Sequence, residues 1–214
     1  MFSEKEIKRH IETGTTTVGI VCSDGIVLGA ERKATMGYLV ASKKAEKVKQ
    51  LDEHIGMTIA GVVGDAQALE RYIKAELKLY KLREARRAPV AAAAHLIANM
   101  MYARRFWPYI VQLVVGGYDT RARLYSFAPD GSVIEEDQFY SSGSGSPMAF
   151  GVLEHDYRKG LAMQEGKKLA VDAIRSAVQR DIASGGEGMD LAVVDSQGFR
   201  RVPAEETERL SSKN

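Results

Sequence analysis

The chain has 214 residues, a net charge of +2 from 30 basic and 28 acidic side chains, and a hydrophobic content of 45%. The length suits one domain with a sizeable core, and the charge balance gives no preference for nucleic acid or an acidic membrane. The single cysteine, Cys22, excludes an internal disulfide framework, and its apolar neighbours indicate a buried strand thiol.

The chain opens with a short charged leader, residues 1–14, which lacks the apolar core of a secretory signal. Alternating residues then predict strands over 16–22 and 26–31, joined by the hairpin signal Asp24-Gly25. A short apolar run predicts a further strand over 55–62. No stretch reaches the length of a membrane-spanning helix, so we expect a soluble, cytoplasmic protein without a membrane partner.

Helical spacing of apolar residues begins after the strand over 55–62. It predicts a helix over 65–87 with Asp65 as its N-cap. Pro89 ends that helix and can open a second, Ala-rich one. Strands are predicted over 109–115, ahead of Gly116-Gly117, and over 124–127 and 132–135; helices follow near 147–159 and 164–183, then strands over 191–194 and 199–202.

The order of these elements indicates the fold class. Strands gathered in hairpins and helices gathered in pairs favour α+β layers over a parallel sheet. We predict a four-layer αββα sandwich, in which two antiparallel sheets pack face to face between helix layers.

The bond between Gly14 and Thr15 is a candidate cleavage point. A cut there would leave Thr15 with both a hydroxyl, which needs a base to become a nucleophile, and a free α-amine with a pKa of about 7.7–8.0. One residue would then supply nucleophile and base. The alternative interpretation of this segment is a Thr-rich first strand.

Other familiar chemistries find no support in the sequence. It contains no P-loop and no dinucleotide fingerprint. Its four histidines are scattered, without metal-ligand spacing or a triad motif. We therefore predict no metal and no cofactor.

Further polar residues lie beside glycines or at strand ends, and each also has an ordinary structural interpretation. Lys47, in a run of lysines, could be a surface charge, and the Gly-Ser run over 141–147 could be a turn or linker. Asp181 and Ser184 could decorate a helix C-terminus.

Together, these segments give a specific resemblance. From Thr15 to about Glu205 the sequence resembles the β-type subunits of the 20S proteasome, most closely the archaeal kind. The matching runs are TTTVGI (15–20), ERK (31–33), GMTIAGVVGD (56–65), YSSGSGSP (140–147) and RDIASGG (180–186).

The resemblance implies roles for matching residues. It implies that residues 1–14 are a propeptide removed by autocatalysis, that 15–214 form the catalytic domain, and that Thr15 is the N-terminal nucleophile. Lys47 matches the catalytic lysine and Glu31 the acid that pairs with it, a position where many relatives carry Asp. Ser144, Asp181 and Ser184 match residues that orient the threonine amine.

Substrate contacts follow from the same resemblance. Gly61 matches the backbone N–H that forms the oxyanion hole. The positions matching the substrate pocket are Ala34, Thr35, Ala45, Lys49, Ile59, Val63 and Gln67. Small alanines with apolar walls, and a lysine at the rim, predict cleavage after apolar rather than basic residues.

The resemblance also implies an assembly and an activity. It implies a threonine endopeptidase that degrades unfolded proteins, in seven-membered β rings flanked by proteasome α subunits and fed by a regulatory ATPase ring. Two alternatives stay open: a catalytically silent ring subunit, and an N-terminal-nucleophile amidase acting on small molecules. The intact catalytic set disfavours the first, and the proteasome-like runs outside the site disfavour the second.

Overall fold

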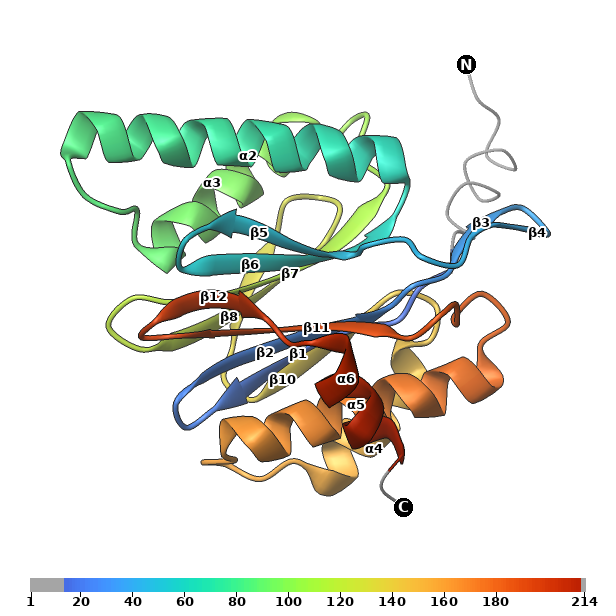
Figure 1. Ribbon diagram of the computed structural model, residues 1–214. Coiled ribbons are helices and arrows are strands. Elements are labelled where there is room, and N and C mark those ends of the chain that lie inside the picture. Colours follow the sequence, from blue (N-terminus) through green and yellow to red (C-terminus); the bar gives the residue numbers. More distant parts are fainter. Residues whose placement is uncertain (1–13, 213–214) are drawn as a thin grey trace.

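Two antiparallel five-stranded sheets stack face to face within residues 14–212, the part of the chain that the computed structural model describes (Figure 1). The first sheet has the order β10-β1-β2-β11-β12: Phe139–Ser142, Thr17–Cys22, Gly25–Glu31, Met189–Asp195 and Gly198–Arg201. The second has the order β5-β6-β7-β8-β9: Val48–Asp52, Ile55–Gly61, Val111–Tyr118, Ala122–Phe127 and Val133–Glu136.

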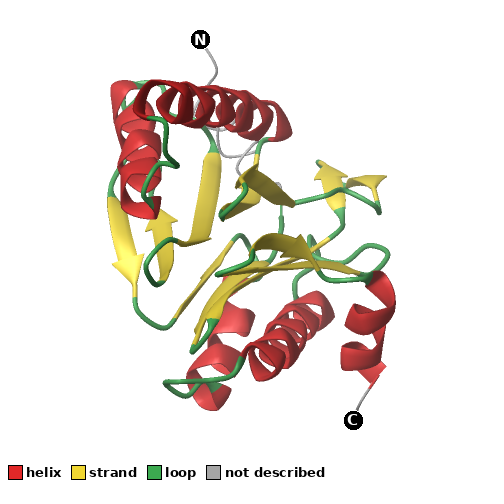
Figure 2. Ribbon diagram, turned by 60° about the vertical axis from the view of Figure 1, so that its left-hand side comes forward, coloured by secondary structure: helices red, strands yellow, loops and turns green. Residues whose placement is uncertain are grey.

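Helices cover both outer faces. On the second sheet lie α2 (Val63–Glu84) and α3 (Val90–Ala103), and on the first lie α4 (Ser146–Asp156) and α5 (Met163–Arg180). Figure 2 shows the same layers from another side. A last helix, α6 (Ala204–Ser212), packs against α5 and β11. The predicted αββα sandwich is thereby confirmed.

The spacing of apolar residues explains how the helix and sheet layers pack against one another. On α2, Leu69, Ile73 and Leu77 are buried against the second sheet, and each such side chain contributes roughly 1.5–3 kcal/mol on burial. A separate cluster between the two sheets includes Leu28 of β2 and Leu124 of β8. Both faces of each sheet are therefore buried, as the layered fold requires.

The strand β1 lies inside its sheet, between β10 and β2. Thr17 pairs with Ala30 on β2 and with Ser142 on β10, so the strand is held along both edges. Cys22, at its end, is the predicted buried thiol, and burial raises its pKa to about 12. The residues directly before β1 therefore start from a rigid support.

Several local predictions differ from the structure. Asp65 is not the N-cap of α2: the helix begins at Val63 after Val62 without a side-chain cap, and Asp65 instead accepts the backbone N–H of Ile110 at 2.9 Å. A carboxylate in the first turn favours the helix dipole while it also fixes the chain entering β7. The strand β7 runs through Gly116-Gly117 rather than ending before them.

Other elements were not predicted. These are the ribbon of β3 (Ala34–Met36) and β4 (Leu39–Ser42), together with β5, β10 and α6. The Gly-Ser run is not a linker: residues 141–142 end β10 and α4 begins at Ser146. The helix α5 ends at Arg180 because Asp181 is extended, with ψ 112°.

Candidate active site

Thr15 lies directly before β1 and is buried, with 4% of its surface exposed. Gly14 still precedes it, so its nitrogen is a peptide N–H, which donates to Ser144 Oγ at 3.2 Å. The hydroxyl of Thr15 donates to the carbonyl oxygen of Gly14 at 2.6 Å. The side chain therefore sits against the peptide bond that precedes it.

Lys47 reaches the same hydroxyl from the other sheet, just before β5. Its ammonium donates to Thr15 Oγ1 at 2.9 Å and to the carbonyl oxygen of Lys33 at 2.6 Å, and forms an ion pair with Glu31. Burial lowers the pKa of Lys47, an effect that the charge of Glu31 partly offsets. The lysine is thus a buried cation beside a hydroxyl, not a surface charge.

Glu31, the last residue of β2, is completely buried and orients this lysine. One carboxylate oxygen accepts the backbone N–H groups of Lys33 at 2.6 Å and Gly185 at 2.9 Å. The other oxygen faces Lys47 and also accepts the N–H of Thr16 at 3.4 Å. A buried carboxylate needs such hydrogen-bond donors. They hold the Glu31 side chain, which is longer than that of an aspartate, in the position where it pairs with Lys47.

A second carboxylate organises the opposite side of Thr15. Asp181, just after α5, accepts the hydroxyl of Ser144 at 2.5 Å and that of Ser184 at 2.6 Å. Ser184 also bonds the hydroxyl of Thr16 at 2.7 Å. Two consecutive hydrogen bonds, from Ser144 to Asp181 and from the Thr15 nitrogen to Ser144, therefore fix the position of that nitrogen.

A cavity of about 170 Å³ opens beside Thr15. All seven residues expected to contact substrate line it, and so does Gly61. Gly61 has a φ of +120°, and a Cβ there would lie 2.3 Å from the carbonyl oxygen of Ile110, so only glycine fits. The structure therefore brings every predicted site residue to one place.

Other residues at this site were not predicted individually. Lys33, Glu46 and Glu70 add charges to the cavity wall. Gly143 packs so closely on Thr15 that it has no room for a side chain, and Gln112 accepts its N–H at 2.7 Å. The run over 141–147 pointed to the region but not to these contacts.

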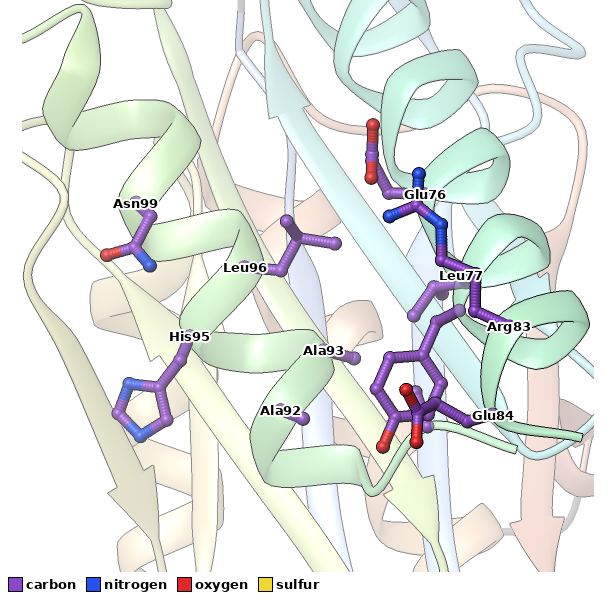
Figure 3. A pocket seen from close by; sticks show the side chains of 11 residues that line it. Glu76, Leu77, Arg83, Glu84, Ala92, Ala93, His95, Leu96 and Asn99 are labelled. Atoms are coloured by element: carbon purple, nitrogen blue, oxygen red, sulfur yellow. The ribbon is translucent and has the colours of Figure 1, made fainter. Parts of the chain in front are cut away.

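A further cavity of about 470 Å³ lies between α2 and α3, and Figure 3 shows its lining. Its lining includes Tyr80 and Arg83 of α2 and His95 and Asn99 of α3. None of the catalytic candidates lines this cavity, which therefore belongs to the helix layer and not to the site around Thr15.

Within residues 14–212, no three His, Cys, Asp or Glu side chains are grouped so as to hold a metal ion. The helices described there include none that is long and apolar enough to cross a membrane.

Comparison with known proteins identifies the family. A family model described as "Proteasome subunit" matches residues 11–194. "Proteasome subunit beta" of Methanococcus aeolicus is 46% identical over 214 residues, covering 99% of this chain and 98% of that protein. Proteins of the same name from Methanosarcina mazei and Ferroglobus placidus are 49% and 47% identical, over 90% and 94% of this chain and 92% and 95% of their own lengths. The chain belongs to the proteasome subunit family.

Proposed function

We propose that this chain is a threonine-type endopeptidase, made as an inactive precursor and activated by loss of residues 1–14. Similarity to archaeal proteasome β subunits over nearly the whole chain supports a catalytic β-subunit role in the 20S core, in protein degradation. Residues 1–13 of the proposed propeptide lie outside the described residues.

One observation carries the proposal: the Thr15 hydroxyl lies 2.9 Å from the buried ammonium of Lys47 and beside the carbonyl of Gly14. A nucleophile in contact with an activating group, itself oriented by a third residue, is the signature of covalent catalysis. Here the third residue is Glu31.

Activation begins at the Gly14–Thr15 bond. Thr15 Oγ gives up its proton as it attacks the carbonyl carbon of Gly14, and the C–N bond breaks as the nitrogen takes up that proton. The resulting ester between Gly14 and the Thr15 hydroxyl is hydrolysed by water, which releases the leader as a carboxylic acid. Thr15 then has a free amine, held by Ser144 and Asp181.

Peptide hydrolysis follows the same steps on a substrate. The Thr15 amine accepts the proton of Oγ, and Oγ attacks the substrate carbonyl. The N–H of Gly61 stabilises the oxyanion. The protonated amine then gives its proton to the leaving nitrogen, an ester remains on Oγ, and water cleaves it to regenerate the free hydroxyl and amine.

The family assignment supports assembly into a proteasome complex with other subunits. We extend this to seven-membered β rings flanked by α subunits, with a regulatory ATPase ring that delivers unfolded proteins in the cytoplasm. No cofactor is needed, because Thr15, Lys47 and Glu31 supply the nucleophile and its activation.

The test compares wild type, Thr15→Ser and Thr15→Ala in the assembled particle. Intact mass should show a wild-type chain starting at Thr15, and Thr15→Ala should retain the leader and hydrolyse no peptide, while Thr15→Ser keeps part of both activities. An active particle whose chain still starts at Met1, or a Thr15→Ala particle with near wild-type hydrolysis, would refute the proposal. Wild-type particles that assemble but cleave no peptide would point instead to a silent ring subunit.

A further inference from the structure

The cavity beside Thr15 is called the first cavity below. Another cavity, of about 330 Å³ and called the second cavity, adjoins the site on the far side of Gly61. Gly61 lines both cavities, and Ser144, the partner of the Thr15 nitrogen, lines only this second one. Most of its remaining wall is apolar and comes from Pro108, Tyr109, Ile110, Val111 and Pro129. The catalytic mechanism above leaves this cavity unused.

The position of the Gly14–Thr15 bond indicates which half of a cleaved peptide each cavity would contact. Gly14, on the acyl side of the bond to be cut, lines the first cavity together with Thr15. The nitrogen of that bond points away, toward Ser144 at 3.2 Å. The scissile bond therefore runs from the first cavity toward the wall of the second.

The same direction applies to a separate substrate. Once freed, the Thr15 amine must hand its proton to the leaving nitrogen, so that nitrogen must lie within hydrogen-bond reach of it. The amine is held by Ser144, which places the leaving half of the substrate on the Ser144 side. The second cavity lies where the first residue of that half would be.

We infer that this second cavity is a subsite for the residue directly after the cleaved bond, and that it selects a large apolar side chain there. This inference rests on the proposed function, because it needs Thr15 to attack a peptide in trans. Gly61 and Gly143 at the edge present backbone without side chains, which allows close approach of an extended peptide.

The chemistry of the wall supports this selectivity. The described residues that line the cavity are all uncharged, so a charged side chain would lose its hydration without gaining a partner. The guanidinium of Arg104 stacks on Tyr109 of the wall, 4.8 Å from the ring centre. This nearby positive charge makes a basic side chain the least favourable occupant.

Ile110 is the residue through which the subsite can be altered. Tyr109 and Val111, on either side of it, belong to the buried core under α3, whereas Ile110 is only half-buried and is not part of that core. Its backbone N–H and carbonyl are held by Asp65 and Val62, whatever its side chain. A substitution there changes the cavity wall while leaving both the core and the catalytic groups in place.

The experiment uses the assembled, processed particle and peptides that share Leu before the cleaved bond. The residue after that bond is Ala, Phe, Lys or Glu, and kcat/KM at that bond is measured by product mass. In the wild type, we expect Phe to exceed Ala by about 10-fold and Lys to be the slowest. In Ile110→Glu the order of Phe and Lys should reverse, whereas the matched control Ile134→Glu, on the exposed face of β9, should keep the wild-type order.

Self-removal of the leader distinguishes failure of this inference from failure of the proposed function. The leaving half in that reaction is the chain itself, so Ile110→Glu should be processed like the wild type. Thr15-dependent cleavage that ignores the residue after the bond, or an unchanged order in Ile110→Glu, overturns the subsite alone. Cleavage independent of Thr15 overturns both. If Ile110→Glu does not assemble, Ile110→Ala decides: it must reduce the preference for Phe over Ala.

Discussion

Gly143 and Thr15 lie closer together than any side chain on residue 143 would allow. A Cβ on Gly143 would stand 2.1 Å from the carbonyl oxygen of Thr15, and the glycine has a φ of +91°. The N–H of Gly145, two residues further on, donates to the same carbonyl at 3.3 Å. The turn between β10 and α4 therefore packs directly against Thr15, the proposed nucleophile.

Gly143→Ala should displace Thr15 and reduce peptide hydrolysis at least about 100-fold, since misplacement of a catalytic group by about 1 Å costs that much. The matched control is Gly151→Ala on α4, where an added Cβ meets nothing within 4 Å. Both variants should be compared in processing, kcat/KM and thermal unfolding. Equal activity of the two variants would show that the close contact is not needed.

Lys47→Arg should be nearly as damaging as Lys47→Ala. The ammonium is enclosed by Thr15, Glu31 and the carbonyl of Lys33, and the planar, larger guanidinium does not fit those three directions. Lys49→Arg, at the rim of the same cavity, is the control. Near wild-type hydrolysis by Lys47→Arg would mean that positive charge alone suffices.

Lys47→Ala has a second consequence, because it leaves the completely buried Glu31 without its cation. Removing one partner of a buried ion pair costs about 3–5 kcal/mol. Denaturant unfolding should show this loss, and Glu31→Gln combined with Lys47→Ala should recover part of it. A double variant as unstable as Lys47→Ala would show that the uncompensated charge is not the cause.

The pH dependence of hydrolysis should reflect the lowered pKa of Lys47. As the pH rises through that pKa, the lysine loses its proton and with it the ion pair, so kcat/KM should fall at a pH below the ordinary range of lysine. Glu31 opposes the shift, so Glu31→Gln should move this alkaline limb to still lower pH. An unmoved or raised limb in Glu31→Gln would contradict this assignment.

The same titration affects stability with the opposite sign. Between the lowered pKa of the folded protein and the ordinary pKa of the unfolded chain, the unfolded chain binds the extra proton. The contribution of Lys47 to the free energy of unfolding therefore rises with pH over that window. Lys47→Ala should remove this rise, which separates loss of activity from loss of fold.

Gly14→Ala should slow removal of the leader. A Cβ on Gly14 would lie 1.7 Å from the Cβ of Ala183 and 2.8 Å from Ser144 Oγ. Since Gly14 is lost on cleavage, mature chains from this variant should have the wild-type kcat/KM per free Thr15. Time-resolved mass measurement during assembly gives the processing rate, and an unchanged rate would show that the crowding is relieved before the bond is cut.

Cleavage should be faster after Leu or Tyr than after Arg in otherwise matched peptides. The first cavity has apolar walls from Ile59 and Val63 beside the small Ala45. Among the charged residues that line it, Lys33, Lys47 and Lys49 outnumber Glu46 and Glu70, and like charges repel a basic side chain. Lys49→Ala should raise cleavage after Arg, and equal cleavage after Arg and Leu in the wild type would refute this interpretation of the pocket.

The layers and most catalytic candidates could be predicted because they follow from periodicity and from long motifs. Burial of Lys47 could not: its neighbours Lys43, Lys44 and Lys49 have the composition of a solvated surface. Its partner Glu31 precedes it by 16 residues and lies on the other sheet. The strands β3 and β4 are too short to form a pattern, and α6 has too few apolar residues for one. Asp65 makes a tertiary contact with Ile110 instead of capping its helix.

The groups around Thr15 come from widely separated parts of the chain: Lys47 is 32 residues away and Ser144 is 129. They meet only when both sheets have formed and stacked. Under the proposed mechanism, the bond before Thr15 breaks only in a chain that has completed its own architecture. On that mechanism, the leader keeps an incompletely folded subunit from becoming a protease, and the reactive amine is released only after folding is complete.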